Sequence, residues 1–244
     1  MISRQKKFIF VHIPKTGGNS VSQALLPFTE SNFEAAASPQ GIKSGENFWP
    51  TDRDLGRDKH NTADWYADHL DFRDYYFFTT VRNPWDRMVS YYFFCKQLCK
   101  QLGSNESPSW VTHAPEIFSK DEFLEFLECR HPTQTSFLGT GLVHVDVMRF
   151  ENLTADFERV CKKLELENVS LGKINSSRRP RYQDILDRDL ELRIGKMYAE
   201  DIERFGYKFA PGYPVSFARI GRMLQGFSRR LSLSRMESRS RDHE

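Results

Sequence analysis

Three short strand-like segments, each followed by a loop and a helix-like stretch, constrain the fold of this chain more than any other feature. They span Phe8–Ile13, Tyr75–Val81 and Val143–Phe150, and they are rich in β-branched and aromatic residues. Neither of the first two carries a charged residue, as expected for strands buried on both faces of a parallel sheet. The connections between them are long enough for helical crossovers. We therefore expect an α/β fold of three layers, with a central parallel sheet flanked by helices.

Helix-like patterns fill most of the remaining chain up to about residue 205. The expected helices are Ser20–Leu26, Thr62–Leu70, Pro84–Leu98, Lys120–Glu128, Ala155–Leu166 and Asp187–Phe205. The chain of 244 residues suits one such domain better than two. We place that domain at residues 1–212. Residues 213–244 are expected to form a basic amphipathic helix followed by a disordered, polar tail.

Composition excludes several classes of function. The net charge is +2, from 35 basic and 33 acidic residues, which argues against nucleic acid as a partner. The four cysteines form no CxxC pair, and we expect no metal site and no metal requirement. Because no apolar stretch is long enough for a signal peptide or a membrane span, we expect a cytoplasmic protein.

The loop after the first strand has the features of an anion site. Its sequence is Pro14-Lys15-Thr16-Gly17-Gly18-Asn19-Ser20. A strand, a glycine turn and a helix in succession aim free backbone N–H groups at one point, where the helix dipole adds positive potential. Lys15 adds a charge, and Thr16 and Ser20 add hydroxyl groups. The alternative is a glycine turn that needs no ligand.

The order of residues in this loop separates it from an ATP-binding loop. The Walker A pattern, GxxxxGK[ST], places its lysine after the glycines, whereas Lys15 precedes Gly17 and Gly18. A nucleoside-triphosphate hydrolase is therefore disfavoured. Because the strand, glycine turn and helix still follow one another as in a P-loop, we describe the fold as P-loop-like.

A second candidate anion site follows the second strand. Arg82 stands at the end of the strand, and Ser90 lies about two turns into the next helix. An arginine suits phosphate because its planar fork donates two hydrogen bonds. The alternative is that Arg82 pairs with a carboxylate while Ser90 faces solvent. Arg87, between them, is expected to be an exposed residue of the helix surface.

These two motifs resemble a known family, the sulfotransferases that use 3′-phosphoadenosine 5′-phosphosulfate (PAPS), and within it the carbohydrate branch, family 2. The resemblance implies that residues 15–20 bind the 5′-phosphosulfate. It also implies that Arg82 and Ser90 hold the 3′-phosphate. Asn19 departs from the threonine usual in this family, but it can still donate a hydrogen bond.

The same resemblance extends to a basic loop late in the chain, residues 175–182. It implies that Ser177 and Arg178 touch the 3′-phosphate and that Tyr182 packs near the adenine. A solvated basic loop is the alternative for each of these residues.

Sulfuryl transfer needs charge stabilisation and a base, and the sequence offers candidates for both. Lys15 is placed to neutralise charge near the bridging oxygen of the donor. His60 resembles the base of the uronyl 2-O-sulfotransferase relatives, and imidazole is the natural base near neutral pH. His12 is interpreted as structural. Glu151 either orients a basic group or fixes its loop.

The sequence therefore predicts a PAPS-dependent sulfotransferase that modifies a hydroxyl group, favouring a carbohydrate over another small molecule. One alternative is a P-loop small-molecule kinase. The other is a non-catalytic nucleotide-binding module whose tail, residues 213–244, contacts a membrane or a partner.

Overall fold

The computed structural model describes residues 1–29, 60–102, 109, 111–129, 131–172 and 179–209. Within these residues the chain forms one mixed sheet of four strands in the order β1-β2-β3-β4. The strands are β1 (Ile2–Ser3), β2 (Phe8–Val11), β3 (Tyr76–Val81) and β4 (Val145–Arg149). The predicted tail at 213–244 lies outside the described residues.

The three predicted strands pair in parallel. Phe8 of β2 lies opposite Tyr76 of β3, and Val81 at the end of β3 lies opposite Arg149 of β4. Their carboxyl ends, and the loops that follow, therefore meet at one edge of the sheet. Strand β1 adds an antiparallel edge and was not predicted, because two residues are too few to show a period.

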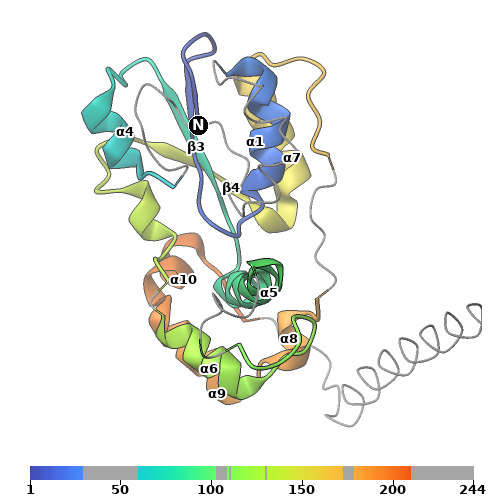
Figure 1. The fold of residues 1–244 in the computed structure, drawn as a ribbon. Helices are drawn as coiled ribbons and strands as arrows, with labels where there is room; N and C mark the ends of the chain where they lie inside the picture. The colour runs from blue at the N-terminus through green and yellow to red at the C-terminus, as the bar shows by residue number, and fades with distance from the viewer. Residues whose placement is uncertain (30–59, 103–108, 110, 130, 173–178, 210–244) are drawn as a thin grey trace, which may run out of the picture.

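One face of the sheet is covered by α1 (Gly18–Leu25) and α7 (Leu153–Lys163), which lie side by side in Figure 1. Phe8 and Phe10 of β2 and Phe78 of β3 point to this face. Helix side chains complete this cluster, namely Val21, Leu25, Phe157, Val160 and Cys161. Leu26–Phe28 continues α1 as a 3-10 turn, η1.

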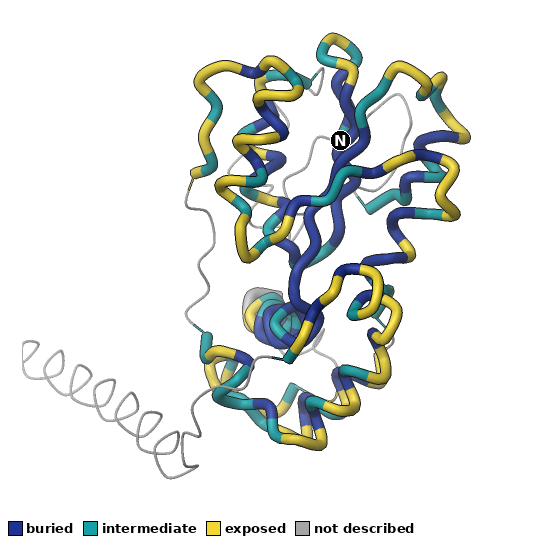
Figure 2. Tube along the Cα trace, turned by 180° about the vertical axis from the view of Figure 1, so that it is seen from behind, coloured by how far each residue is buried: buried dark blue, intermediate teal, exposed yellow. Residues whose placement is uncertain are grey.

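The other face receives the alternate residues of the same strands, Ile9 and Val11 of β2 and Phe77 and Val81 of β3. The helices α4 (Ala63–His69), α5 (Pro84–Leu102), α6 (Lys120–Glu128), α8 (Tyr182–Ile185), α9 (Arg188–Met197) and α10 (Ala199–Phe205) contribute to this larger cluster. All residues of β2 and all residues of β3 except Tyr76 are buried, whereas β4 is only partly buried (Figure 2). The predicted three-layer α/β fold is confirmed.

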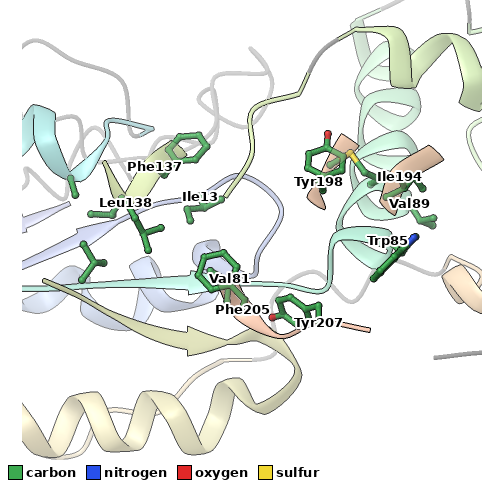
Figure 3. Packing of buried hydrophobic residues seen from close by; sticks show 14 of the residues in the cluster. Ile13, Val81, Trp85, Val89, Phe137, Leu138, Ile194, Tyr198, Phe205 and Tyr207 are labelled. Carbon is green, nitrogen blue, oxygen red and sulfur yellow. The ribbon is translucent and has the colours of Figure 1, made fainter. Parts of the chain in front are cut away.

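The larger cluster joins the edge where the strands end to the helices beyond it. Figure 3 shows Val81 at the end of β3 near Phe205 and Tyr207, with Trp85 and Val89 of α5 beside Ile194 of α9. Two short 3-10 helices lie at this edge, η3 (Thr135–Leu138) and η4 (Phe150–Asn152). The site loops are thereby backed by packed helices.

The last predicted helix, Asp187–Phe205, forms two helices instead of one. Asp187 caps α9 by accepting a hydrogen bond from the N–H of Leu190, and the helix ends at Met197. Tyr198, at the break, has a non-helical φ of −116° and is buried. The new helix α10 packs against η3 and buries Asp201. The sequence shows no proline or glycine at this break, so its pattern reads as continuous.

Candidate active site

The first loop leaves the end of β2 and enters α1 through two glycines. Gly17, the residue before α1, has a left-handed φ of +87°, which favours glycine, and a Cβ there would lie 2.7 Å from the Phe150 ring. A Cβ on Gly18 would lie 2.1 Å from the His12 ring. No side chain caps α1 at Gly17. The N–H of Ser20 donates to the Gly17 carbonyl at 3.1 Å, so the N–H groups that precede Ser20 in this turn are the ones that can face an anion.

The side chains of this loop divide between the interior and the surface. The buried hydroxyl of Thr16 donates to the carbonyl of Ile13 at 2.9 Å, which fixes the loop. Asn19 is exposed and Ser20 half-buried in the first turn of α1. Lys15 has a left-handed φ of +67°, rare for a lysine, and its Nζ lies 3.9 Å from the centroid of the Phe94 ring. Such strain often marks a functional residue.

Arg82 is buried at the end of β3, and it contacts both loops. Its Nε and Nη2 donate to Oδ2 of Asp86 at 2.7 and 2.5 Å, and its Nη1 donates to the carbonyl of Lys15 at 3.1 Å. The guanidinium also stacks 3.8 Å from the centroid of Phe150. Arg82 thus pairs with a carboxylate, as predicted for a strand end that binds no phosphate. The same interpretation predicted that Ser90 faces solvent, but Ser90 is buried.

Arg179 is a second arginine on the same carboxylate, and no motif singles it out within the basic loop of residues 175–182. Its Nη2 donates to Oδ1 of Asp86 at 2.7 Å, and only 10% of its side chain is exposed. Burial lowers the pKa of Arg82, Asp86 opposes that shift, and the positive charge of Arg179 adds to it. Asp86 therefore pairs with two largely buried guanidinium groups, and the nearby carboxylate of Glu151 also acts on the charge of Arg82.

Arg87 was predicted to be exposed, and that prediction is wrong. Its side chain is fully buried, with Nε donating to the carbonyl of Pro14 at 3.0 Å and Nη1 to the carbonyl of Pro132 at 2.9 Å. No described residue bonds to its Nη2. Burial lowers its pKa from the ordinary value. An arginine on a helix normally faces water, but here two loop carbonyls supply buried acceptors that the sequence could not reveal.

The two anion loops are therefore one assembly. Arg82 and Arg87, from the second loop and its helix, donate to the carbonyls of Lys15 and Pro14 in the first. Buried hydrogen bonds from charged donors are among the stronger contacts in proteins. The parallel sheet brings the loops together, and the arginines fix their spacing.

The structure places His60 at the first loop. Its Nδ1 lies 3.1 Å from the carbonyl oxygen of His12 and 3.2 Å from Nδ1 of His12, and the rings stack with centroids 4.8 Å apart. A carbonyl can only accept a hydrogen bond, so this contact assigns the proton of neutral His60 to Nδ1. Nε2 is then the nitrogen able to accept a proton.

Glu151 fixes the second loop. Its Oε1 accepts from the N–H of Asn83 at 2.7 Å, and its Oε2 accepts from the hydroxyl of Tyr207 at 3.0 Å. The side-chain amide of Asn83 also donates to the carbonyl of Lys208 at 3.2 Å. The loop-fixing interpretation of Glu151 agrees with these contacts.

Of the late loop, only its end is described. Ser177 and Arg178 lie outside the described residues. Tyr182, the first residue of α8, is buried and packs edge-on against Phe209 with centroids 5.4 Å apart. Phe209 packs in the same way on Trp85 of α5. Tyr182 therefore belongs to the core beneath the second loop.

Among the described residues, no group of three or more His, Cys, Asp or Glu side chains could hold a metal ion. None of the helices described is both long and apolar enough to cross a bilayer.

Comparison with known proteins agrees with this geometry. The sequence model described as "Sulfotransferase family" matches residues 1–208, which include both anion loops and the whole described sheet. The match falls on the family 2 branch that the motifs resemble. No curated protein and no solved structure gave a significant match. The chain thus belongs to the sulfotransferase family, a family of transferases that move sulfuryl groups.

Proposed function

We propose that the protein transfers a sulfuryl group from PAPS to a hydroxyl group, with a carbohydrate as the favoured acceptor class. The observation that carries the proposal is the joined pair of anion loops. PAPS bears a phosphosulfate at one end and a 3′-phosphate at the other, so it needs two anion sites held at a fixed spacing. The arginine contacts to the carbonyls of Pro14 and Lys15 support such a spacing.

The residues present fit a ligand that carries two anionic groups. The uncapped N-terminus of α1, with Lys15, suits the phosphosulfate, and Thr16 to Ser20 line the same turn. By resemblance to the family, the 3′-phosphate is assigned to Arg82 and Ser90, with Ser177 and Arg178. The two guanidinium groups that meet at Asp86 support the 3′-phosphate assignment. Nothing in this assignment requires a metal.

In the proposed reaction, the acceptor oxygen attacks sulfur and the bond from sulfur to the bridging phosphate oxygen breaks. The acceptor proton passes to Nε2 of His60, because the contact of Nδ1 with the His12 carbonyl assigns the proton of the neutral ring to Nδ1. Lys15 balances the charge that develops on the leaving oxygen. The products are the sulfate ester and 3′,5′-ADP.

The reaction is tested with sulfur-labelled PAPS and a panel of glycan and small-molecule alcohols. The amount of 3′,5′-ADP formed should equal the amount of labelled sulfate ester.

In the same assay, His60→Ala is expected to lower kcat by about 10²- to 10⁴-fold, because a positioned base contributes that much. Unfolding temperature should stay near that of the unmodified protein, since His60 is only partly buried.

His144→Ala is the matched control, because His144 is exposed just before β4. It should leave kcat unchanged. Equal rates for His60→Ala and the unmodified protein would remove the base assignment. Phosphoryl transfer from ATP–Mg²⁺, with PAPS left intact, would establish a kinase and overturn the proposed function.

A further inference from the structure

Gln134 has a buried side chain that forms hydrogen bonds with both main-chain groups of Arg82, the N–H and the carbonyl. Its Oε1 accepts from the N–H of Arg82 at 2.8 Å, and its Nε2 donates to the carbonyl of Arg82 at 2.9 Å. Gln134 is fully buried at the start of η3. Because one partner only donates and the other only accepts, these contacts fix the orientation of the amide.

These two bonds replace sheet pairing that Arg82 lacks. The parallel ladder between β3 and β4 ends at Val81, so the main chain of Arg82 lies one residue beyond it. A buried backbone N–H or carbonyl without a hydrogen-bond partner costs free energy. The amide of Gln134 extends the pairing by one residue, at the position from which the Arg82 guanidinium projects.

Asp201 of α10 holds Gln134 in turn. Its Oδ2 accepts from the main-chain N–H of Gln134 at 2.8 Å and from Nε2 at 3.3 Å, while its Oδ1 accepts from the N–H of Thr135 at 2.8 Å. Asp201 is fully buried, and its charge also acts on the buried Arg87. Its carboxylate therefore satisfies donors from η3 and offsets part of the positive charge near the first loop.

We propose that Gln134 and Asp201 are positioning residues for the 3′-phosphate site, acting through the main chain of Arg82. This inference rests on the proposed function, which assigns the 3′-phosphate to Arg82. The residues touch no ligand themselves. They keep the strand end rigid, so that the guanidinium can exchange its contact with Asp86 for a phosphate without the loop rearranging.

The test separates positioning from general stability by using two ligands that differ only in the 3′-phosphate. Calorimetric titration gives the Kd of 3′,5′-ADP and of 5′-AMP for the unmodified protein and for Gln134→Met, which keeps the length of the side chain without its hydrogen bonds. We expect the affinity for 3′,5′-ADP to fall roughly 10- to 100-fold, the scale of a charge-assisted hydrogen bond. The affinity for 5′-AMP should change by less than about two-fold, since this ligand has no 3′-phosphate for the Arg82 guanidinium to bind.

Two controls and a second variant make the result decisive. Thr135→Val keeps the main-chain bond to Asp201 and removes only a hydroxyl that bonds to no described residue, so both affinities should be unchanged. Val160→Ala lowers stability in the opposite cluster, between β-sheet and α7, and shows what lost stability alone does to Kd. If Gln134→Met does not fold, Asp201→Asn is the second variant. It should give the same selective loss of affinity for 3′,5′-ADP, because one of the two acceptor oxygens of Asp201 is replaced by an NH₂ group.

Equal weakening of both ligands, or no weakening of either, would overturn the positioning role while leaving the proposed function intact. Failure of the unmodified protein to bind 3′,5′-ADP would overturn the proposed function and, with it, this inference.

Discussion

Replacing Lys15 by Ala lowers the rate of sulfuryl transfer by about 10²- to 10³-fold, the usual effect of removing a group that stabilises transition-state charge. In the structure its Nζ rests 3.9 Å above the Phe94 ring, at a residue with a left-handed φ. A cation that lies over an aromatic face is attracted and oriented by the ring. Single-turnover kinetics with saturating PAPS and acceptor measure the effect on chemistry.

Lys163→Ala is the matched control for this prediction. Lys163 also lies over an aromatic ring, that of Tyr76 at 4.1 Å, but at the end of α7 on the sheet face covered by α1 and α7. Its removal should leave the rate unchanged. A similar loss in both variants would show that the lysines act through stability or net charge, and a normal rate in Lys15→Ala would end its catalytic assignment.

Replacing Glu122 by Ala lowers the free energy of unfolding by about 3–5 kcal/mol, since it strands a buried charge. Glu122 of α6 lies 2.6 Å from Nζ of Lys96 on α5, and both side chains are almost fully buried. Tyr92 donates its hydroxyl to the same Oε2 at 2.6 Å, and the N–H of His113 donates to Oε1 at 2.6 Å. Urea unfolding followed by circular dichroism measures the loss.

The matched control lies on the same helix. Glu128 pairs with Arg193 at 3.1 Å in an exposed position, so Glu128→Ala should cost at most about 1 kcal/mol. Replacing both partners of the buried pair, as Lys96→Met with Glu122→Leu, should recover much of the lost stability. A cost for Glu122→Ala as small as that for Glu128→Ala would contradict the buried network.

The same group makes stability depend on pH. Burial alone would raise the pKa of Glu122, but hydrogen bonds from Lys96 and Tyr92 outweigh it and hold the pKa well below its ordinary value of 4.5. A carboxyl with a depressed folded-state pKa stabilises the fold fully above the unfolded-state pKa. Its contribution is therefore lost as the pH falls below about 4.5 toward the folded-state pKa. In Glu122→Gln, the free energy of unfolding should therefore fall less steeply as the pH is lowered below about 4.5.

Local patterns were sufficient to predict the elements that carry the loops. The runs before Lys15 and Arg82 are apolar enough to identify buried strands, and the glycines at 17 and 18 mark the turn between β2 and α1. The His60 assignment came from resemblance, and the structure adds its contact with His12.

The supports of the site could not be predicted, because they depend on contacts between distant segments. Gln134 reaches Arg82 from 52 residues away, and Arg179 reaches Asp86 from 93. A glutamine in a loop and an arginine in a basic stretch look solvent-exposed in sequence. Arg87 was misjudged for the same reason, since its acceptors are carbonyls of Pro14 and Pro132, which any residue type supplies.

The central claim is that two joined anion loops bind a nucleotide with phosphates at both ends of its ribose. Calorimetric titration of the full chain with 3′,5′-ADP, in buffer without magnesium, tests it most directly. We predict saturable one-to-one binding that is tighter than binding of 5′-AMP, because Arg82 and its partners contribute only when the 3′-phosphate is present. Binding of ATP only with Mg²⁺, and no binding of 3′,5′-ADP, would contradict the account.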